Sequence, residues 1–82
     1  MAKPTQAHLP KTLDKGLPLS QKEMEKRKMR YYMDAKLLEV GVDPKTVIYR
    51  WSVEPQGTRE RWTCSAYWGD SKDKIVAEET GD

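Results

Sequence analysis

The sequence predicts an α+β fold, in which one long capped α-helix packs on an antiparallel β-hairpin and a disordered N-terminal arm precedes them. Residues 20–40 contain no glycine or proline and are rich in strong helix formers. Residues 46–54 and 59–68 are rich in β-branched and aromatic residues, which favour strands. Between these two segments, Pro55-Gln56-Gly57-Thr58 has the composition of a hairpin loop.

Length, charge and cysteine usage limit the class of protein. The 82 residues allow one small domain, for which partner binding is a plausible source of stability. Residues 1–30 carry eight Lys or Arg against three Asp or Glu, whereas residues 69–82 carry two against five. A single cysteine excludes an intramolecular disulfide, and no apolar run is long enough for a signal peptide or a membrane span. We therefore expect a cytoplasmic protein with no membrane partner.

Residues 1–18 are predicted to form a flexible basic arm. Pro4, Pro10 and Pro18 remove backbone donors and restrict their neighbours, so neither a helix nor a strand is expected to persist there. The alternative is an arm that becomes ordered on a partner, with its isolated leucines docking.

The long helix has recognisable start and stop signals. Ser20 and Glu23 have the spacing of a capping box, which predicts that the helix begins there. It should end near Val40, because Gly41 can adopt a left-handed conformation and Pro44 prevents continuation.

Two apolar stripes run along nearly opposite sides of this helix. One consists of Met24, Tyr31, Ala35 and Leu38, and the other of Met29, Met33, Leu37 and Val40. A surface helix normally has one apolar face, so a second stripe requires a second partner. We expect the second stripe to meet another protein, a second copy of this chain, or a mobile segment such as the N-terminal arm, since methionines suit an adaptable surface. The homodimer would form through Met29, Met33, Leu37 and Val40. The alternative is one broad apolar face that serves the core.

Residues 41–51 allow a second interpretation. Gly41-Val42, followed by polar residues and Thr46-Val47, resembles the turn and the start of the recognition helix in helix-turn-helix DNA-binding proteins. The resemblance implies a DNA-reading helix that continues through residues 49–51. However, Leu37 stands where a small residue is usual, and Arg50 stands where an apolar one is. The β-branched and aromatic residues of 46–53 favour a strand instead.

The two arms of the hairpin can pair in a register that separates apolar from polar residues. This register pairs Glu54 with Arg59, Trp51 with Trp62, and Tyr49 with Cys64. One face then carries the apolar side chains and should lie under the helix. The other face carries Arg50, Arg61 and Tyr67 among shorter polar residues.

The segment after Trp68 is predicted to contain little structure. Ile75-Val76 could form a short third strand or one turn of helix, and residues 77–82 read as a frayed acidic tail. Residues 19–76 would then make up the small α+β domain.

No residue pattern predicts an enzyme or a metal site. Cys64 is the only thiol and His8 the only imidazole, and we expect the first in the core and the second in the arm. One cysteine and one histidine are too few ligands for a structural zinc site, and the carboxylates lack the spacing of a calcium loop. We therefore expect no catalysis, no metal and no cofactor.

The remaining signal is a set of basic and aromatic residues. We predict a non-enzymatic regulator or inhibitor that binds a larger protein machine, plausibly transcription machinery such as RNA polymerase, in the manner of a phage-type protein. The residues expected to contact the partner are Lys26, Arg27, Arg30, Met33, Arg50, Arg61 and Tyr67. The alternative is direct binding of DNA or RNA through the basic helix start and the hairpin arginines.

Overall fold

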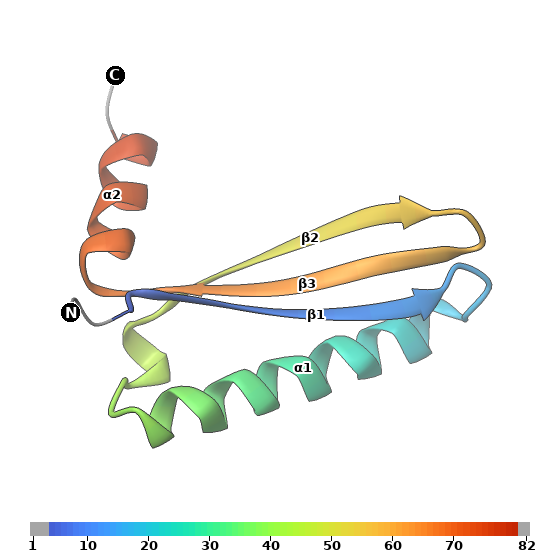
Figure 1. The fold of residues 1–82 in the computed structure, drawn as a ribbon, viewed down its shortest axis with the longest axis horizontal. Coiled ribbons are helices and arrows are strands. Elements are labelled where there is room, and N and C mark those ends of the chain that lie inside the picture. Colours follow the sequence, from blue (N-terminus) through green and yellow to red (C-terminus); the bar gives the residue numbers. More distant parts are fainter. Residues whose placement is uncertain (1–3, 81–82) are drawn as a thin grey trace.

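The protein is an α+β fold, as the sequence predicts, with a three-stranded antiparallel sheet and two α-helices. The computed structural model describes residues 4–80. The elements in chain order are β1 (Gln6–Asp14), α1 (Leu19–Glu39), the short 3-10 helix η1 (Pro44–Thr46), β2 (Ile48–Gln56), β3 (Arg59–Tyr67) and α2 (Gly69–Thr80). Helix α1 runs along one face of the sheet, and α2 stands at the end of the sheet where β1 begins (Figure 1).

The third strand comes from the segment that was predicted to be a flexible arm. Strand β1 pairs antiparallel with β3 along its whole length, so the strand order is β1-β3-β2 and β3 is central. The prediction of a flexible arm is therefore wrong for residues 6–14, and residues 1–3 lie outside the described part of the chain.

Pro10 is compatible with this strand because of the side to which its nitrogen points. The Trp68 amide donates to the Thr5 carbonyl at 2.9 Å, and the Lys15 amide donates to the Thr58 carbonyl at 3.1 Å. These two bonds lie at odd-numbered positions of the β1 register, so even-numbered residues direct their backbone groups to the free edge. Pro10 therefore removes no hydrogen bond from the β1–β3 ladder.

The hairpin has the predicted faces but a different register. Gln56 lies opposite Arg59, so the loop is only Gly57-Thr58, with Gly57 at a φ of 65° that suits a tight two-residue turn. The predicted register is wrong by two residues, because β2 continues through Pro55 instead of ending before it. The observed pairs include Trp51 with Cys64, Val53 with Trp62, and Tyr49 with Ala66. A two-residue shift keeps every side chain on its face.

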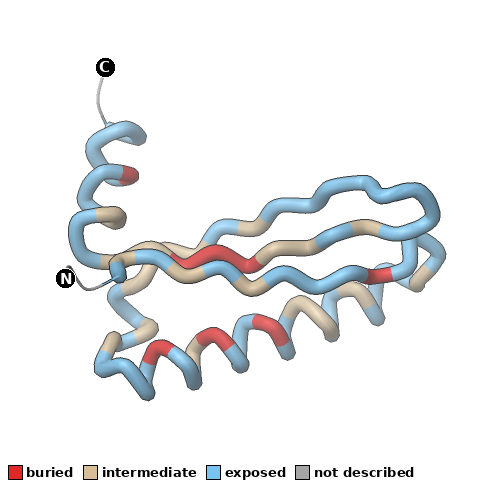
Figure 2. Tube along the Cα trace, in the orientation of Figure 1, coloured by how far each residue is buried: buried red, intermediate tan, exposed pale blue. Residues whose placement is uncertain are grey.

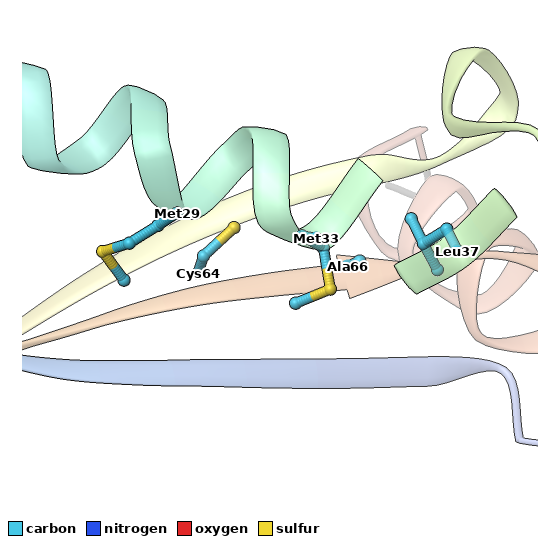
Figure 3. Packing of buried hydrophobic residues seen from close by; sticks show 5 residues of the cluster. All are labelled: Met29, Met33, Leu37, Cys64 and Ala66. Atoms are coloured by element: carbon cyan, nitrogen blue, oxygen red, sulfur yellow. The ribbon is translucent and has the colours of Figure 1, made fainter. Parts of the chain in front are cut away.

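The core lies between α1 and the centre of β3. It consists of Met29, Met33 and Leu37 from the helix with Cys64 and Ala66 from the strand, as Figure 3 shows from close by. The buried residues of α1 follow one another along the side of the helix that faces the sheet (Figure 2).

This arrangement reverses the predicted roles of the two helix stripes. Met33 is only 4% exposed, so it belongs to the core and cannot serve as the predicted partner contact. The predicted homodimer through Met29, Met33, Leu37 and Val40 is wrong for the same reason, since its first three residues are buried under the sheet. The stripe that contains Met24, Tyr31 and Leu38 faces outward instead.

The two ends of α1 differ in how well they were predicted. The helix begins at Leu19 with Pro18 as its N-cap residue, so Ser20 lies inside the helix and the predicted capping box does not form. At the other end, the Val42 amide donates to the Leu37 carbonyl at 2.8 Å, and Gly41 has a positive φ of 81°. This is the glycine-terminated helix end that the sequence predicts.

The connection to β2 rules out the recognition helix that the helix-turn-helix resemblance implies. Asp43 accepts a hydrogen bond from the Lys45 amide at 2.9 Å and caps only the three residues of η1. The chain then becomes extended, and Ile48 to Gln56 form β2. The strand interpretation of this segment is therefore confirmed.

Helix α2 spans residues 69–80, so the helical alternative for Ile75-Val76 is confirmed, whereas the predicted turn and the frayed tail up to residue 80 are wrong. Its one buried side chain, Ile75, lines a hollow with Gln6 and Tyr67 on the sheet face away from α1. Two polar contacts tie it to the β2 region: Glu79 pairs with Arg50 at 2.6 Å, and Lys72 donates to the Thr46 carbonyl at 2.7 Å. Residues 81–82 of the predicted tail lie outside the described part.

Two neighbouring leucines test the orientation of α1. Leu37 is 2% exposed and Leu38 is 63% exposed. Replacing Leu37 with Ala should lower the free energy of unfolding by about 2–5 kcal/mol, because it leaves a cavity in the core. Leu38→Ala should change it by less than about 0.5 kcal/mol. Urea unfolding followed by circular dichroism measures both, and equal effects of the two substitutions would contradict this orientation.

Candidate functional site

A cationic hollow lies between α1 and the edge strand β2. It is open to solvent and has a volume of about 620 Å³. The residues that line this cationic hollow are Glu23, Lys26, Arg27, Arg30, Tyr31, Asp34 and Trp51. All but Trp51 come from one flank of α1, where a spacing of three and four residues brings side chains side by side. Trp51 comes from β2 and lines the side of the hollow opposite the helix.

Two of the three positive charges of the hollow are held against aromatic rings. Lys26 Nζ lies 4.9 Å from the centroid of the Trp51 ring, and Arg30 Cζ lies 3.6 Å from the centroid of the Tyr49 ring. Both distances are those of cation–π contacts, which restrict long side chains that would otherwise move freely. The hollow is therefore a partly ordered arrangement of cations.

Asp34 is already bound by groups within the protein. Tyr49 donates its hydroxyl hydrogen to Asp34 Oδ1, and Arg30 Nε donates to the same oxygen at 3.4 Å. Lys26 and Arg27, in contrast, form no ion pair with any residue of 4–80. These two cations are thus free to meet an external anion, with Glu23 as the opposing carboxylate on the rim.

Partial burial raises the pKa of Tyr49 to about 12, and the hydrogen bond to Asp34 acts in the same direction. The phenol therefore stays neutral over the whole physiological range. It remains a donor that keeps Asp34 turned towards β2.

The structure brings together only some of the predicted contact residues. Lys26, Arg27 and Arg30 share the cationic hollow. Arg50 lies on the opposite face of the sheet, where it pairs with Glu79 of α2. Arg61 and Tyr67 point to that same opposite face, Arg61 across from Glu54 and Tyr67 against the ring of His8. The predicted set is therefore divided between two faces of the molecule.

The outward side of α1 carries a row of large apolar side chains that are exposed in the described part of the chain. Met24, Tyr31 and Leu38 are 56%, 74% and 63% exposed and stand seven residues apart along one line. We call these three residues the outward stripe. Tyr32, at 53% exposed, lies on its flank. The outward stripe borders the cationic hollow, since Tyr31 belongs to both.

Two residues of this region were missed as contact residues in the sequence. Trp51 was assigned to the core because it lies on the apolar face of the hairpin, but it is only half-buried since β2 is an edge strand. Tyr31 was assigned to the stripe under the sheet. The sequence held no signal for this choice, because cations lie beside both stripes of the helix.

The groups that could carry nucleophilic chemistry are separated by the sheet. Cys64 is fully buried under α1, and burial raises the pKa of its thiol to about 11. His8 lies on the other face, where its Nδ1 is 2.8 Å from Ser65 Oγ. The imidazole therefore cannot act as a base for the thiol, and the buried position predicted for Cys64 is confirmed.

Comparison with protein-family models, with curated proteins and with solved structures finds no match to this chain. Neither helix in the described part is long and apolar enough to cross a membrane. Residues 4–80 also contain no group of three or more His, Cys, Asp or Glu side chains placed to hold a metal ion. We therefore infer function from the surfaces described above.

The raised pKa of Tyr49 predicts a pH effect on stability. Because the folded protein favours the neutral phenol, this stabilisation is fully present below pH 10 and is lost as the pH rises from 10 through about 12. Tyr49→Phe should remove that part of the pH dependence, whereas Tyr31→Phe, at an exposed position, should retain it. Thermal unfolding of both variants across this range measures the effect, and identical profiles would contradict the Tyr49–Asp34 interaction.

The burial of Cys64 predicts an unreactive thiol. At about pH 8 a disulfide reagent should modify the urea-unfolded protein at once but leave the folded protein largely unmodified, because only exposed thiolate reacts. Rapid stoichiometric labelling of the folded protein would show that α1 does not cover β3.

Proposed function

We propose that this protein is a non-enzymatic regulatory protein that binds a larger protein through α1, using the outward stripe and the adjacent cationic hollow. The observation that carries the proposal is the exposure of Met24, Tyr31 and Leu38 on a helix whose other side is sealed in the core. Exposed apolar side chains that line up along a helix are the anchors by which helices dock in partner grooves.

The surroundings of the outward stripe describe the partner surface. Arg27 and Lys28 lie beside Tyr31, and Lys26 lies beyond them in the cationic hollow. A groove with an apolar floor and acidic residues on its rim would complement both features, since charge complementarity guides association and orientation. Transcription machinery, as predicted from the sequence, remains the class of partner that we would test first.

A second candidate function is direct binding of nucleic acid at the cationic hollow. It is favoured by one observation, the placement of Lys26 over Trp51, because a cation beside an aromatic ring can hold a phosphate while a base stacks. The positions of Arg50 and Arg61 weigh against it. They lie on the far face of the sheet, and Arg50 is paired with Glu79. No single surface therefore collects the basic residues on which that prediction depended.

The proposed setting is the cytoplasm. Cys64 is the single cysteine and is buried as a free thiol, which suits a reducing compartment. The separation of Cys64 from His8 excludes a catalytic Cys–His pair between these two residues.

The double substitution Met24→Ser and Leu38→Ser tests the proposed function. Both residues are exposed and neither lines the cationic hollow, so the fold and the hollow should be kept. The partner that co-purifies with the tagged wild-type protein should bind the variant at least about tenfold more weakly, because buried apolar anchors dominate such interfaces. Titration of the purified partner measures the change.

The matched control is Val76→Ser on α2, which removes an exposed apolar side chain 42% exposed and far from α1 in the chain. It should bind the partner like the wild type. Full retention of the partner by the double variant would contradict a role for the outward stripe. In parallel, duplex and single-stranded oligonucleotides are titrated at about 50 mM salt, where association that weakens steeply towards about 200 mM would favour the second candidate function.

A further inference from the structure

The free edge of β2 differs from the free edge of β1 in what it offers to another chain. In the β1–β3 ladder the odd-numbered residues of β1 bond to even-numbered residues of β3. The odd-numbered residues of β3 therefore bond to β2, which they meet at its even-numbered positions. The backbone groups of Tyr49, Trp51 and Val53 consequently point away from the sheet.

These three residues present an uninterrupted row of donors and acceptors. Each contributes one N–H and one C=O group to the edge, and the next outward residue, Pro55, lies at the strand end where a missing N–H matters least. Strand β1 is different, because Pro10 stands in the middle of its free edge and interrupts the row of donors. A proline in an edge strand commonly prevents pairing with other chains. Strand β2 has no proline at its outward positions 49, 51 and 53.

The cationic hollow lies beside the open edge, on the α1 side. Trp51 contributes its backbone to the edge and its side chain to the hollow. A strand added to β2 would place the side chains opposite Tyr49, Trp51 and Val53 on this same side, because directly opposed residues share a face. Every second side chain of the added strand would therefore point towards Lys26 and Arg27.

The charges of the hollow select the chemistry of those side chains. Asp34 is occupied by Tyr49 and Arg30, so Glu23 is the one carboxylate of the hollow that faces the two unpaired cations Lys26 and Arg27. The surplus is positive, which favours carboxylates at alternate positions of an added strand and disfavours lysines there.

We propose that β2 accepts an extended acidic segment of the partner protein as a fourth strand, with alternate carboxylates directed into the cationic hollow. This inference rests on the proposed function, since it names the kind of segment that a protein partner would supply. Strand addition takes affinity from main-chain hydrogen bonds and specificity from alternate side chains. Tyr49, Trp51 and Val53 offer the free backbone groups, and the cationic hollow beside them offers the contacts to alternate side chains.

Two synthetic peptides test the proposal by nuclear magnetic resonance. The probe is Thr-Glu-Val-Glu-Val-Glu-Thr, and the control carries Lys in place of each Glu. On titration with the probe, the amides of Tyr49, Trp51 and Val53 should shift and exchange more slowly with solvent. The amides of Arg50 and Ser52, which already bond to β3, should change less. The Lys peptide should leave all of them unchanged.

Variants separate the two parts of the interaction. Val53→Pro removes one outward N–H without removing a ladder bond, so it should weaken binding of the probe peptide. Val53→Ala keeps that N–H and should bind the probe peptide like the wild type. The double substitution Lys26→Glu and Arg27→Glu should weaken the probe about tenfold or more. Arg59→Glu, a charge reversal on the other sheet face, should have little effect.

Several outcomes would overturn the proposal. These are equal binding of both peptides, shifts confined to α1, and loss of the free-edge amide signals with rising protein concentration alone, which would indicate that a second copy occupies the edge. Failure here is distinguishable from failure of the proposed function. The probe should bind Met24→Ser/Leu38→Ser like the wild type, whereas the partner should not. A stripe-dependent partner without probe binding would remove the edge site and keep the function.

Discussion

The packing of Met29, Met33 and Leu37 on the small side chains of β3 is the contact on which the rest of the structure depends. Cys64 and Ala66 project little from the central strand, so the long helix side chains can lie directly on it (Figure 3). Close packing at this line fixes the rotation of α1 about its axis. That rotation decides which side chains remain on the outer surface, and it leaves Tyr31 and Leu38 exposed there.

The same rotation gives α1 two unlike flanks. On the β1 side, Lys11 pairs with Glu25 and thereby lowers the pKa of that carboxyl, so charges there are matched within the protein. On the β2 side, Lys26 and Arg27 have no such partner among residues 4–80. The free backbone groups of the two edge strands differ in the same way. Pro10 interrupts the row of N–H donors on β1, whereas the outward N–H groups of β2 from Tyr49 to Val53 are all present. We attribute the binding capacity of the protein to the β2 side and the outward stripe.

Much of this fold could be predicted from local sequence. The helix, its glycine end at Gly41, and the apolar and polar faces of the hairpin follow from composition and alternation alone. Strand β1 could not be predicted in the same way, because a proline excludes a central strand but not an outward position on an edge, and the position of Pro10 depends on pairing with a distant segment. The predicted hairpin register was wrong for the same reason, since Pro55 lies at an outward position of edge strand β2 and does not end the strand.

The candidate site was predicted in part. Lys26, Arg27 and Arg30 are helix neighbours, so their grouping follows from spacing. The two stripes of α1 are nearly equal in apolar content, and only the shape of the sheet beneath decides which one is buried. Because the Met33 stripe is the buried one, Met33 belongs to the core, and Trp51 at the edge of the sheet lines the candidate site. Edge and centre positions of the sheet are likewise set by β1, whose pairing spans more than half of the chain.

The most direct test of this account is the proton contacts of the methionine methyl groups, measured by nuclear Overhauser spectroscopy on selectively labelled protein. The structure predicts contacts from the Met29 and Met33 methyl groups to Cys64 and Ala66, and none from the Met24 methyl group to β3. Contacts of Met24 with Cys64 or Ala66, together with solvent-exposed Met33, would contradict the rotation of α1. Both the outward stripe and the cationic hollow would then have to be abandoned.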